Sequence, residues 1–296
     1  MQTTLKAALA LIALSAIGTP AYAAEPSADA RATYDDIKAT LGVVPDFLRQ
    51  FPEEAIGAVW SDLKGTQLNP RSAIPGKYKE LIALGVAAQV PCRYCTYFHT
   101  RAAQLGGASE RETREAVVMA SIVRKWSTVL NGLRIDEAAF SAELDRIVAH
   151  IKRGKAAPPV AVTDAASAYR DIEATLGLVP SFLRGYPEAG IAGAWRELKT
   201  MQLSPTTAIS PKYKELIGLG VSSQIPCRYC TVFHTVAAKL NGATDAEIRE
   251  AVGMAAMTRH WSTFLNGMML DETTFRRDTD AVIEHLRRQA VRTAKR

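Results

Sequence analysis

Apolar residues recur every three to four positions along most of the chain, the spacing that places them on one face of an α-helix. The segment Glu53–Leu68 is a clear example. Its apolar positions with this spacing are Ile56, Val59, Trp60 and Leu63. No segment alternates apolar and polar residues with the two-residue period of a half-buried strand. The pattern therefore predicts an all-α fold.

Glycine, proline and capping residues mark where the predicted helices begin and end. A helix over Tyr34–Leu41 stops at Gly42. Ser109 and Glu112 form a capping box that opens a helix ending at Asn131–Gly132. The remaining predicted helices are a short one from Asp46, one over Tyr78–Gln89, one from Pro91 to Leu105 and one over Asp136–Ile151.

The same pattern then starts again at a constant offset of 135 residues, without a gap. Matched pairs include Tyr34 and Tyr169, Gly42 and Gly177, Trp60 and Trp195, Trp126 and Trp261, and the capping boxes at Ser109 and Thr244. Two units of this length predict two tandem helical domains rather than a solenoid of short repeats. The predicted division is a tail at 24–33, domain 1 at 34–151, a Pro- and Ala-rich linker at 152–168, domain 2 at 169–286 and a basic tail at 287–296.

The first 23 residues have the features of a secretory signal peptide. Lys6 precedes an apolar run over Ala7–Ile17, which is too short to span a bilayer, and Ala21-Tyr22-Ala23 fits a cleavage site. We expect cleavage after Ala23 and a periplasmic or secreted protein; a retained membrane anchor is the alternative. No later apolar run is long enough to cross a membrane, so no membrane association is expected after cleavage.

Composition and charge narrow the class of protein without identifying it. The chain is 48% hydrophobic and 22% charged, which is ordinary for a soluble protein with a well-formed core, and its net charge is +6. Basic residues do not form a stripe interleaved with aromatics, so nucleic acid is not an expected partner. The dense basic cluster at Arg287–Arg296 is interpreted as a solvated helix end.

One stretch concentrates the residues that could do chemistry. Lys77–Thr100 and Lys212–Thr235 are identical at 19 of 24 aligned positions, and together they hold all four cysteines. Each copy has a Glu, then 11 residues, then Cys-x-x-Cys, then three residues, then His. The candidate catalytic residues are Glu80, Cys92, Cys95 and His99 in the first copy, and Glu215, Cys227, Cys230 and His234 in the second.

Helix geometry explains why these residue types could work together. With Pro91 at the first helical position, Cys92, Cys95 and His99 fall on one helical face. A cysteine in the first turn, near an imidazole, is biased toward the reactive thiolate. Glu80 lies on the preceding apolar helix, and its carboxyl reaches the same face if the two helices pack as a hairpin.

Other interpretations of these residues remain open at this stage. The cysteine pairs could form stabilising disulfides in an oxidising compartment, or could bind a metal together with the His and the Glu. A core histidine and a solvated helix carboxylate are the alternatives for the His and the Glu. Haem attachment is disfavoured because Thr96 and Thr231 stand where that motif requires His. Other side chains are assigned simpler places: the four tryptophans in the core, and Lys77, Lys79, their repeat partners and His150, His260 and His285 at the surface.

The motif E-x11-C-x-x-C-x3-H, followed by a Gly-Ala-(Ser/Thr)-x-x-Glu helix start, resembles the alkylhydroperoxidase D / carboxymuconolactone decarboxylase superfamily. The resemblance covers both repeats and implies an all-α fold, assembly into trimers or hexamers, and thiol-dependent peroxidase chemistry. It implies that Cys95 and Cys230 carry the sulfenic acid and that Cys92 and Cys227 act as proton donors and resolving partners. Glu80 with His99, and Glu215 with His234, would form the proton relay. Tyr94 and Tyr229 stand where alkylhydroperoxidase D has a further histidine.

The sequence thus predicts a peroxidase that reduces a small-molecule peroxide through dithiol–disulfide cycling, with a thiol electron donor and neither cofactor nor metal. General thiol–disulfide exchange and the superfamily's decarboxylase or lactone chemistry are the alternatives. The protein is expected to be a homo-oligomer, or to pair its two repeats as an intrachain pseudo-dimer.

Overall fold

A computed structural model describes residues 26–154 and 161–294 of the chain. All regular secondary structure within these residues is helical, which confirms the predicted all-α class. The first repeat contains α1 (Ala28–Leu41), α2 (Asp46–Arg49), α3 (Glu53–Thr66), α4 (Gly76–Gln89), α5 (Arg93–Leu105), α6 (Glu110–Gly132) and α7 (Glu137–Lys152). The second contains α8 (Ala165–Leu176), α9 (Ser181–Arg184), α10 (Glu188–Glu197), the π-helix η1 (Leu198–Gln202), α11 (Pro211–Gln224), α12 (Arg228–Leu240), α13 (Asp245–Gly267) and α14 (Glu272–Ala294).

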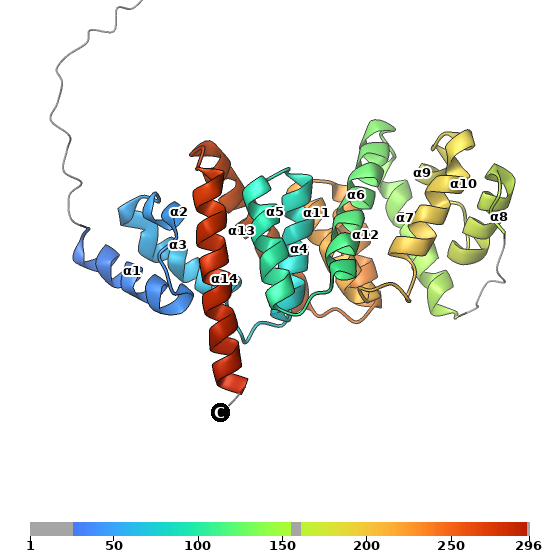
Figure 1. Ribbon diagram of the computed structural model, residues 1–296. Helices are drawn as coiled ribbons and strands as arrows, with labels where there is room; N and C mark the ends of the chain where they lie inside the picture. Colours follow the sequence, from blue (N-terminus) through green and yellow to red (C-terminus); the bar gives the residue numbers. More distant parts are fainter. Residues whose placement is uncertain (1–25, 155–160, 295–296) are drawn as a thin grey trace, which may run out of the picture.

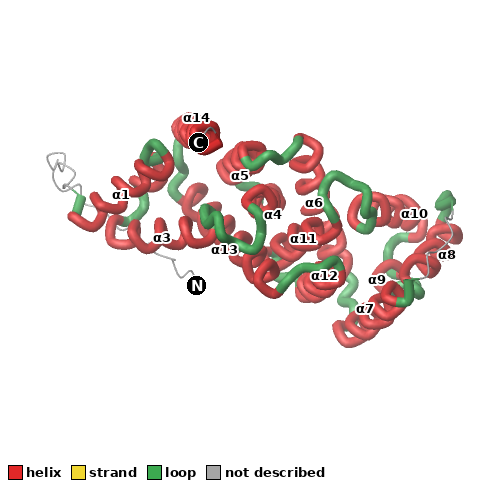
Figure 2. The backbone as a smooth tube through the Cα atoms, turned by 90° about the horizontal axis from the view of Figure 1, so that it is seen from below, coloured by secondary structure: helices red, strands yellow, loops and turns green. Residues whose placement is uncertain are grey.

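The helices form an elongated row with α4 and α11 near its middle (Figures 1 and 2). Helices α1–α3 lie at one end and α8–α10 at the other (Figure 1). The central core is shared between the repeats, because it combines buried residues of α4, α6, α11 and α13. Helix α4 is buried continuously from Lys79 to Ala87, which explains why its sequence is apolar on nearly every side.

The contacts between the two repeats are reciprocal. Tyr78 stacks on its repeat partner Tyr213, with ring centroids 3.5 Å apart. A side chain at Gly85 would meet Ile217, and one at Gly220 would meet Ile82, so the two glycines let α4 and α11 approach closely. Such contacts, in which residue i meets j and j meets i, are those of a two-fold symmetric pair.

Two carboxylates extend this reciprocity to the loops that precede α4 and α11. Glu250 accepts the backbone N–H groups of Ala73 and Ile74, each at 2.7 Å. Its repeat partner Glu115 accepts those of Ala208 at 2.7 Å and Ile209 at 3.2 Å. Each repeat therefore holds the loop of the other.

The first three helices of each repeat cover the last two helices of the other. Residues of α1–α3 form one apolar cluster with Trp261 of α13 and Phe275 of α14. Residues of α8–α10 form another with Trp126 of α6 and Ile147 of α7. The predicted tryptophan positions are confirmed, because Trp60, Trp126, Trp195 and Trp261 are all buried.

Two of the histidines expected at the surface take part in this packing. Gly42 and Gly177 end α1 and α8 in the left-handed conformation, at φ of +81° and +80°. A Cβ at either glycine would overlap a histidine of the other repeat, His285 or His150 respectively. Both histidines are half-buried, so the surface prediction was wrong for them, whereas His260 is exposed.

Local boundaries follow the capping residues, and α1 and α8 begin well before their predicted starts. The capping boxes at Ser109 and Thr244 are confirmed. Helix α1 begins at Ala28 because the Ser27 side chain accepts the Ala30 N–H, so part of the segment 24–33 expected as a tail is helical. Helix α8 begins at Ala165 behind a capping box at Asp164, so the last residues of the expected linker 152–168 are helical as well.

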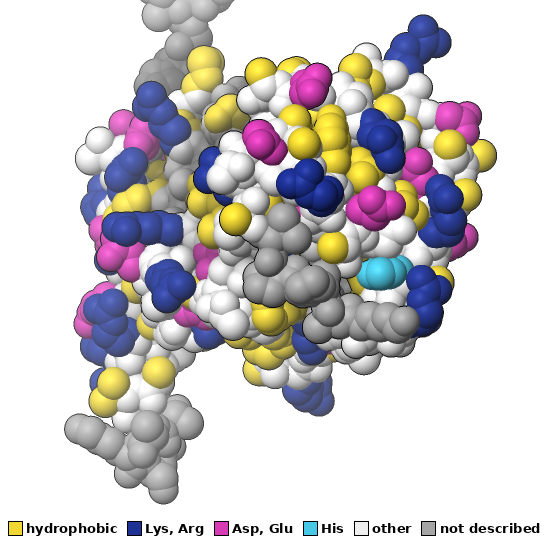
Figure 3. Space-filling model, turned by 90° about the vertical axis from the view of Figure 1, so that its right-hand side faces the viewer, with side chains coloured by type: hydrophobic (Ala, Val, Ile, Leu, Met, Phe, Trp, Pro, Cys, Tyr) yellow, Lys and Arg dark blue, Asp and Glu magenta, His cyan; other side chains and the backbone are white. Residues whose placement is uncertain are grey.

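The predicted signal peptide, residues 1–23, lies outside the described residues, and export stays a prediction. Among the helices that the structure describes, none is long and apolar enough to cross a bilayer. On the face seen in Figure 3, basic and acidic side chains are interspersed with small apolar areas.

Candidate active site

The cysteines of each repeat lie at the start of a helix that packs against the preceding apolar helix. Cys92 is the N-cap of α5, rather than a residue of its first turn as Pro91 had suggested, and its Sγ accepts the Cys95 N–H at 3.2 Å. Cys227 caps α12 in the same way, accepting the Cys230 N–H at 3.3 Å. Cys92 forms a disulfide with Cys95, and Cys227 forms one with Cys230.

The histidine and the glutamate of each motif are in direct contact. His99 Nδ1 lies 2.7 Å from Glu80 Oε2, and His234 Nδ1 lies 2.6 Å from Glu215 Oε2. All four side chains are buried. The structure therefore brings together the predicted residues of each repeat, because α4 packs against α5 and α11 against α12. We call Glu80, Cys92, Cys95 and His99 centre 1, and Glu215, Cys227, Cys230 and His234 centre 2.

A buried glutamine extends each polar pair. Gln67 Nε2 donates to Glu80 Oε1 at 2.9 Å, and Gln202 Nε2 donates to Glu215 Oε1 at 3.3 Å. The glutamine and the histidine thus hold the two oxygens of one carboxylate in a Gln–Glu–His chain. Sequence reasoning missed Gln67 and Gln202, although their identity at the 135-residue offset was a signal that could have found them.

A buried lysine anchors the loop that follows each glutamine. Lys79 donates to the Thr66 and Asn69 carbonyls, and Lys214 donates to Met201 O at 2.7 Å and Ser204 O at 2.5 Å. Burial lowers the pKa of both ammonium groups. The prediction that these lysines are solvated was wrong, because each is needed to satisfy carbonyls at the end of the preceding helix.

Centre 1 lies in the wall of an apolar cavity of about 270 Å³. The polar residues in its lining include Cys95, Glu80, His99 and Gln67. Most of the rest is aliphatic or aromatic, and it includes α13 and α14 residues of the other repeat, such as Trp261 and Val282. Cys95 lines this cavity, whereas Cys92 does not.

Centre 2 lies in the wall of a much smaller cavity, of about 50 Å³. Its lining includes Cys230, His234 and Gln202, with Trp126 and Phe140 from the other repeat. The cysteine that faces the cavity is again the second of the pair. Both centres are thus completed by helices of the opposite repeat, which the linear motif gave no means to predict.

The tyrosines between the cysteines also bond across the repeats. Tyr94 Oη donates to the Leu270 carbonyl at 2.6 Å, and Tyr229 Oη donates to the Ile135 carbonyl at 2.5 Å. The accepting carbonyls belong to the turns that join α13 to α14 and α6 to α7. These tyrosines therefore fasten each cysteine helix to the opposite repeat.

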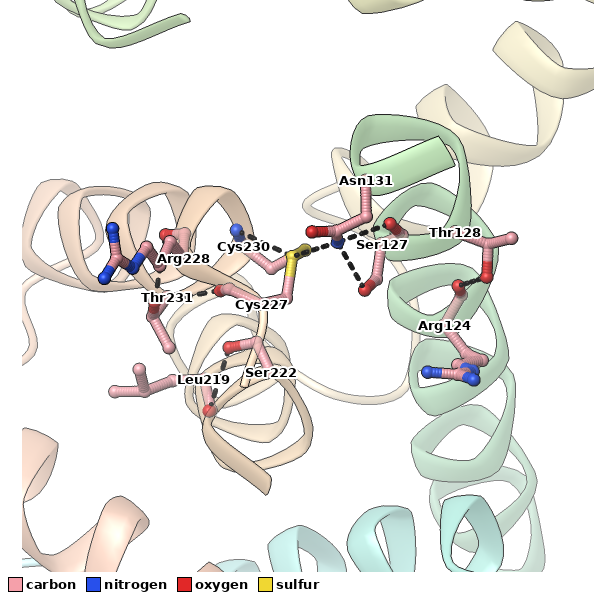
Figure 4. Close-up of a disulfide and its surroundings, with 10 residues drawn as sticks. All are labelled: Arg124, Ser127, Thr128, Asn131, Leu219, Ser222, Cys227, Arg228, Cys230 and Thr231. Carbon is pink, nitrogen blue, oxygen red and sulfur yellow. Dashed lines mark hydrogen bonds between the residues drawn. A yellow bond between two sulfur atoms is a disulfide. The ribbon is translucent and has the colours of Figure 1, made fainter. Parts of the chain in front are cut away.

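The disulfide of centre 2 has a polar neighbour in repeat 1. Asn131 of α6 points toward the sulfur atoms, and its Nδ2 lies 3.6 Å from Cys227 Sγ (Figure 4). The same Nδ2 donates to the Ser127 carbonyl at 2.7 Å. This contact places an N–H donor from repeat 1 beside the capping cysteine of repeat 2.

Metal binding was one open interpretation of the cysteine motif. Within residues 26–154 and 161–294, no group of three or more His, Cys, Asp and Glu side chains is arranged to hold a metal ion. What each centre does hold is a vicinal pair of sulfurs beside a Glu–His pair.

The chain is similar to one known protein family and to a solved structure. The model of the carboxymuconolactone decarboxylase family matches the chain twice, over residues 54–138 and 189–270. A crystal structure from Burkholderia xenovorans LB400, described as that of a gamma-carboxymuconolactone decarboxylase subunit, covers 88% of this chain and 98% of its own. The two share 17% sequence identity at a TM-score of 0.53, a likeness that shows the fold alone. No curated protein matches the chain.

Proposed function

The chain belongs to the carboxymuconolactone decarboxylase family, and from that premise we propose that it is a thiol-dependent peroxidase. The observation that carries the proposal is the arrangement of each centre: two sulfurs one helical turn apart, with the second facing a cavity that is also lined by a histidine in contact with a buried glutamate. Peroxide reduction requires a thiolate nucleophile, a proton source and a second thiol within reach.

The first step is attack by the cavity-facing sulfur. In the reduced protein, the Cys95 thiolate attacks the terminal oxygen of a hydroperoxide, ROOH. An S–O bond forms as the O–O bond breaks, which leaves a sulfenic acid on Cys95 and releases ROH once its oxygen has taken a proton. The role falls to Cys95 because Cys95, and not Cys92, lines the cavity.

The second step closes the disulfide. The Cys92 sulfur attacks the sulfenic sulfur of Cys95, and the sulfenic oxygen leaves as water. Two electrons have then passed from the dithiol to the peroxide. Cys92 is suited to this role because its Sγ already accepts the Cys95 N–H at the start of α5, a position that favours the thiolate.

The Glu–His pair supplies proton traffic in both steps. Glu80 holds His99 through Nδ1, so proton exchange with the sulfur and the leaving oxygen falls to the other ring nitrogen, Nε2. Gln67 fixes the opposite oxygen of the carboxylate and keeps it oriented. Gln67 is therefore a positioning residue, whereas His99 is the catalytic proton carrier.

The cycle is completed by a thiol donor. A donor dithiol exchanges with the Cys92–Cys95 disulfide through a mixed disulfide, restoring both thiols and leaving the donor oxidised. The same steps apply to Cys230, Cys227, His234 and Glu215 in centre 2. The natural donor is proposed to belong to the compartment to which the predicted signal peptide directs the chain.

Decarboxylase or lactone chemistry is the second candidate, favoured by the family description and by the structural neighbour. Those reactions do not require vicinal thiols. The two candidates are separated by the double variant Cys95→Ser, Cys230→Ser, since a decarboxylase or lactone-handling enzyme would keep its activity without these thiols, whereas a peroxidase would lose it.

The proposal is tested by following the loss of hydrogen peroxide and cumene hydroperoxide with dithiothreitol as reductant. We expect turnover by the wild-type protein and none by the double variant Cys95→Ser, Cys230→Ser. The matched control is Thr96→Ser with Thr231→Ser, which changes the next residue in each helix and leaves the sulfurs in place. Full activity in the cysteine variant would overturn the assignment.

A further inference from the structure

The two centres have the same motif but very different space in front of the sulfur. The cavity at Cys95 has a volume of about 270 Å³, and that at Cys230 about 50 Å³. Several residues around the larger cavity have a different residue type as repeat partner, and two such differences bear on the size.

The clearest difference lies on the helix that the opposite repeat contributes. Thr279 of α14 lines the cavity of centre 1, and its repeat partner in α7 is Leu144. Leu144 is buried in the apolar cluster that contains both cysteines of centre 2. The longer leucine side chain therefore packs into space that is left open beside Thr279.

A second difference lies under the histidine. Gly218 of α11 has Ala83 of α4 as its repeat partner. A Cβ at Gly218 would overlap the His234 ring, so His234 occupies space that the Ala83 methyl group occupies in the first repeat. His234 thus lies closer to α11 than His99 can lie to α4.

We propose that the two centres reduce peroxides of different size. Centre 1 takes bulky apolar organic hydroperoxides, and centre 2 takes only hydrogen peroxide or a hydroperoxide of similar size. This inference rests on the proposed peroxidase function and adds the substrate class of each centre. Thr279 and Leu144 are its specificity-determining residues.

The volumes set the limit for each centre. An apolar cavity of about 150 Å³ holds one benzene molecule, so about 270 Å³ holds roughly ten to eleven heavy atoms. Cumene hydroperoxide is of that size. A water molecule needs at least about 10–15 Å³ of such volume, so the smaller cavity has room for a hydrogen peroxide molecule and not for an aromatic ring.

Single-centre proteins test the proposal directly. The variant Cys227→Ser, Cys230→Ser retains only centre 1, and Cys92→Ser, Cys95→Ser retains only centre 2. With dithiothreitol as reductant, we expect both to reduce hydrogen peroxide. For cumene hydroperoxide, kcat/KM should be about tenfold or more higher in the protein that retains centre 1, because steric exclusion from a packed pocket discriminates by at least this much. Equal values in the two proteins would overturn the proposal.

Exchange of the specificity residues asks whether size is the cause. In the protein that retains centre 1, Thr279→Leu should lower the ratio of kcat/KM for cumene hydroperoxide to kcat/KM for hydrogen peroxide by about tenfold. Thr279→Val is the control, because valine has the shape of threonine without the hydroxyl, and it should keep the bulky substrate. Leu144→Thr in the protein that retains centre 2 should raise cumene hydroperoxide turnover. An equal effect of the leucine and valine variants would show that volume is not the determinant.

A binding measurement separates failure of this inference from failure of the proposed function. Calorimetric titration of the oxidised wild-type protein with cumyl alcohol, the product of cumene hydroperoxide, should give one site per chain, weakened by Thr279→Leu and not by Thr279→Val. Binding without any peroxide turnover would refute the peroxidase and leave the cavity assignment standing. Peroxide turnover with two equal alcohol sites per chain would refute the unequal centres alone.

Discussion

Replacing Glu115 by alanine tests how strongly each repeat holds the loop of the other. The buried Glu115 carboxylate accepts the N–H groups of Ala208 at 2.7 Å and Ile209 at 3.2 Å. A hydrogen bond to a charged group contributes about 1.5–3 kcal/mol, and a buried N–H left without a partner costs about as much. Because the Glu115 carboxylate is buried and neither Ala208 nor Ile209 is exposed, we expect Glu115→Ala to lower the free energy of unfolding by about 4 kcal/mol.

The reciprocal variant Glu250→Ala should cost less. Glu250 is half-buried and accepts the N–H groups of Ala73 and Ile74, each at 2.7 Å. Ala73 is exposed, so water can replace the carboxylate at its N–H group. We expect a loss of about 2 kcal/mol, which makes the two equivalent substitutions unequal by about a factor of two.

Urea denaturation followed by circular dichroism at 222 nm measures both losses, and thermal unfolding provides a second readout. At about 3 °C per kcal/mol for a chain of this size, the melting temperature should fall by about 12 °C for Glu115→Ala and about 6 °C for Glu250→Ala. The control is Glu110→Ala, which removes an exposed pair with Arg114 and should cost about 0.5 kcal/mol or less. A loss for Glu115→Ala no larger than that control would refute the reasoning, as would a larger loss for Glu250→Ala.

Two further predictions concern buried charges. Burial raises the pKa of Glu112, but hydrogen bonds from Lys77 and Ser109 outweigh it and leave this pKa below its usual 4.5. The stability that the ionised carboxylate contributes is present above pH 4.5 and is lost as pH falls through the lowered pKa. In urea titrations, the loss of unfolding free energy caused by Glu112→Gln should therefore be constant near neutral pH and shrink toward pH 3. A loss that does not change with pH would argue against this prediction. Lys214→Met removes donors to Met201 O and Ser204 O and should cost about 2 kcal/mol. Because burial lowers the pKa of Lys214, the unfolded chain binds more protons at this group than the folded protein does, and the unfolding free energy of the wild type should rise as pH approaches 10.5. An equal change of unfolding free energy with pH in the wild type and in Lys214→Met would contradict this.

Most of the helices and the paired motifs could be predicted from the sequence, because these features depend on local spacing. The three- to four-residue apolar period, the capping box at Ser109 and the offset of 135 residues identified helices and a duplication. The contact of His99 with Glu80 followed from packing two neighbouring helices as a hairpin. These inferences needed only residues close together in the chain.

What could not be predicted depends on contacts between distant segments. The sequence gives no distance between α5 and α14, so the wall of the cavity in front of Cys95 had no local signature. Lys79 was expected at the surface because lysine usually lies there. Its burial is explained by the carbonyls of Thr66 and Asn69, which accept hydrogen bonds from its ammonium group. Gln67 was overlooked because a glutamine near the end of an amphipathic helix resembles any solvated polar residue.

Because each repeat supplies helices to the centre of the other, the two centres are completed at different stages of synthesis. Tyr94 and the Leu270 carbonyl that it contacts are 176 residues apart, whereas Tyr229 and the Ile135 carbonyl are 94 apart. A chain growing from its N-terminus has made every helix that lines the cavity of centre 2 once α12 is synthesised, and domains fold as their parts emerge. Centre 1 waits for α14, the last helix. A nascent chain released just before α14 would carry one centre with all its walls and one open to water.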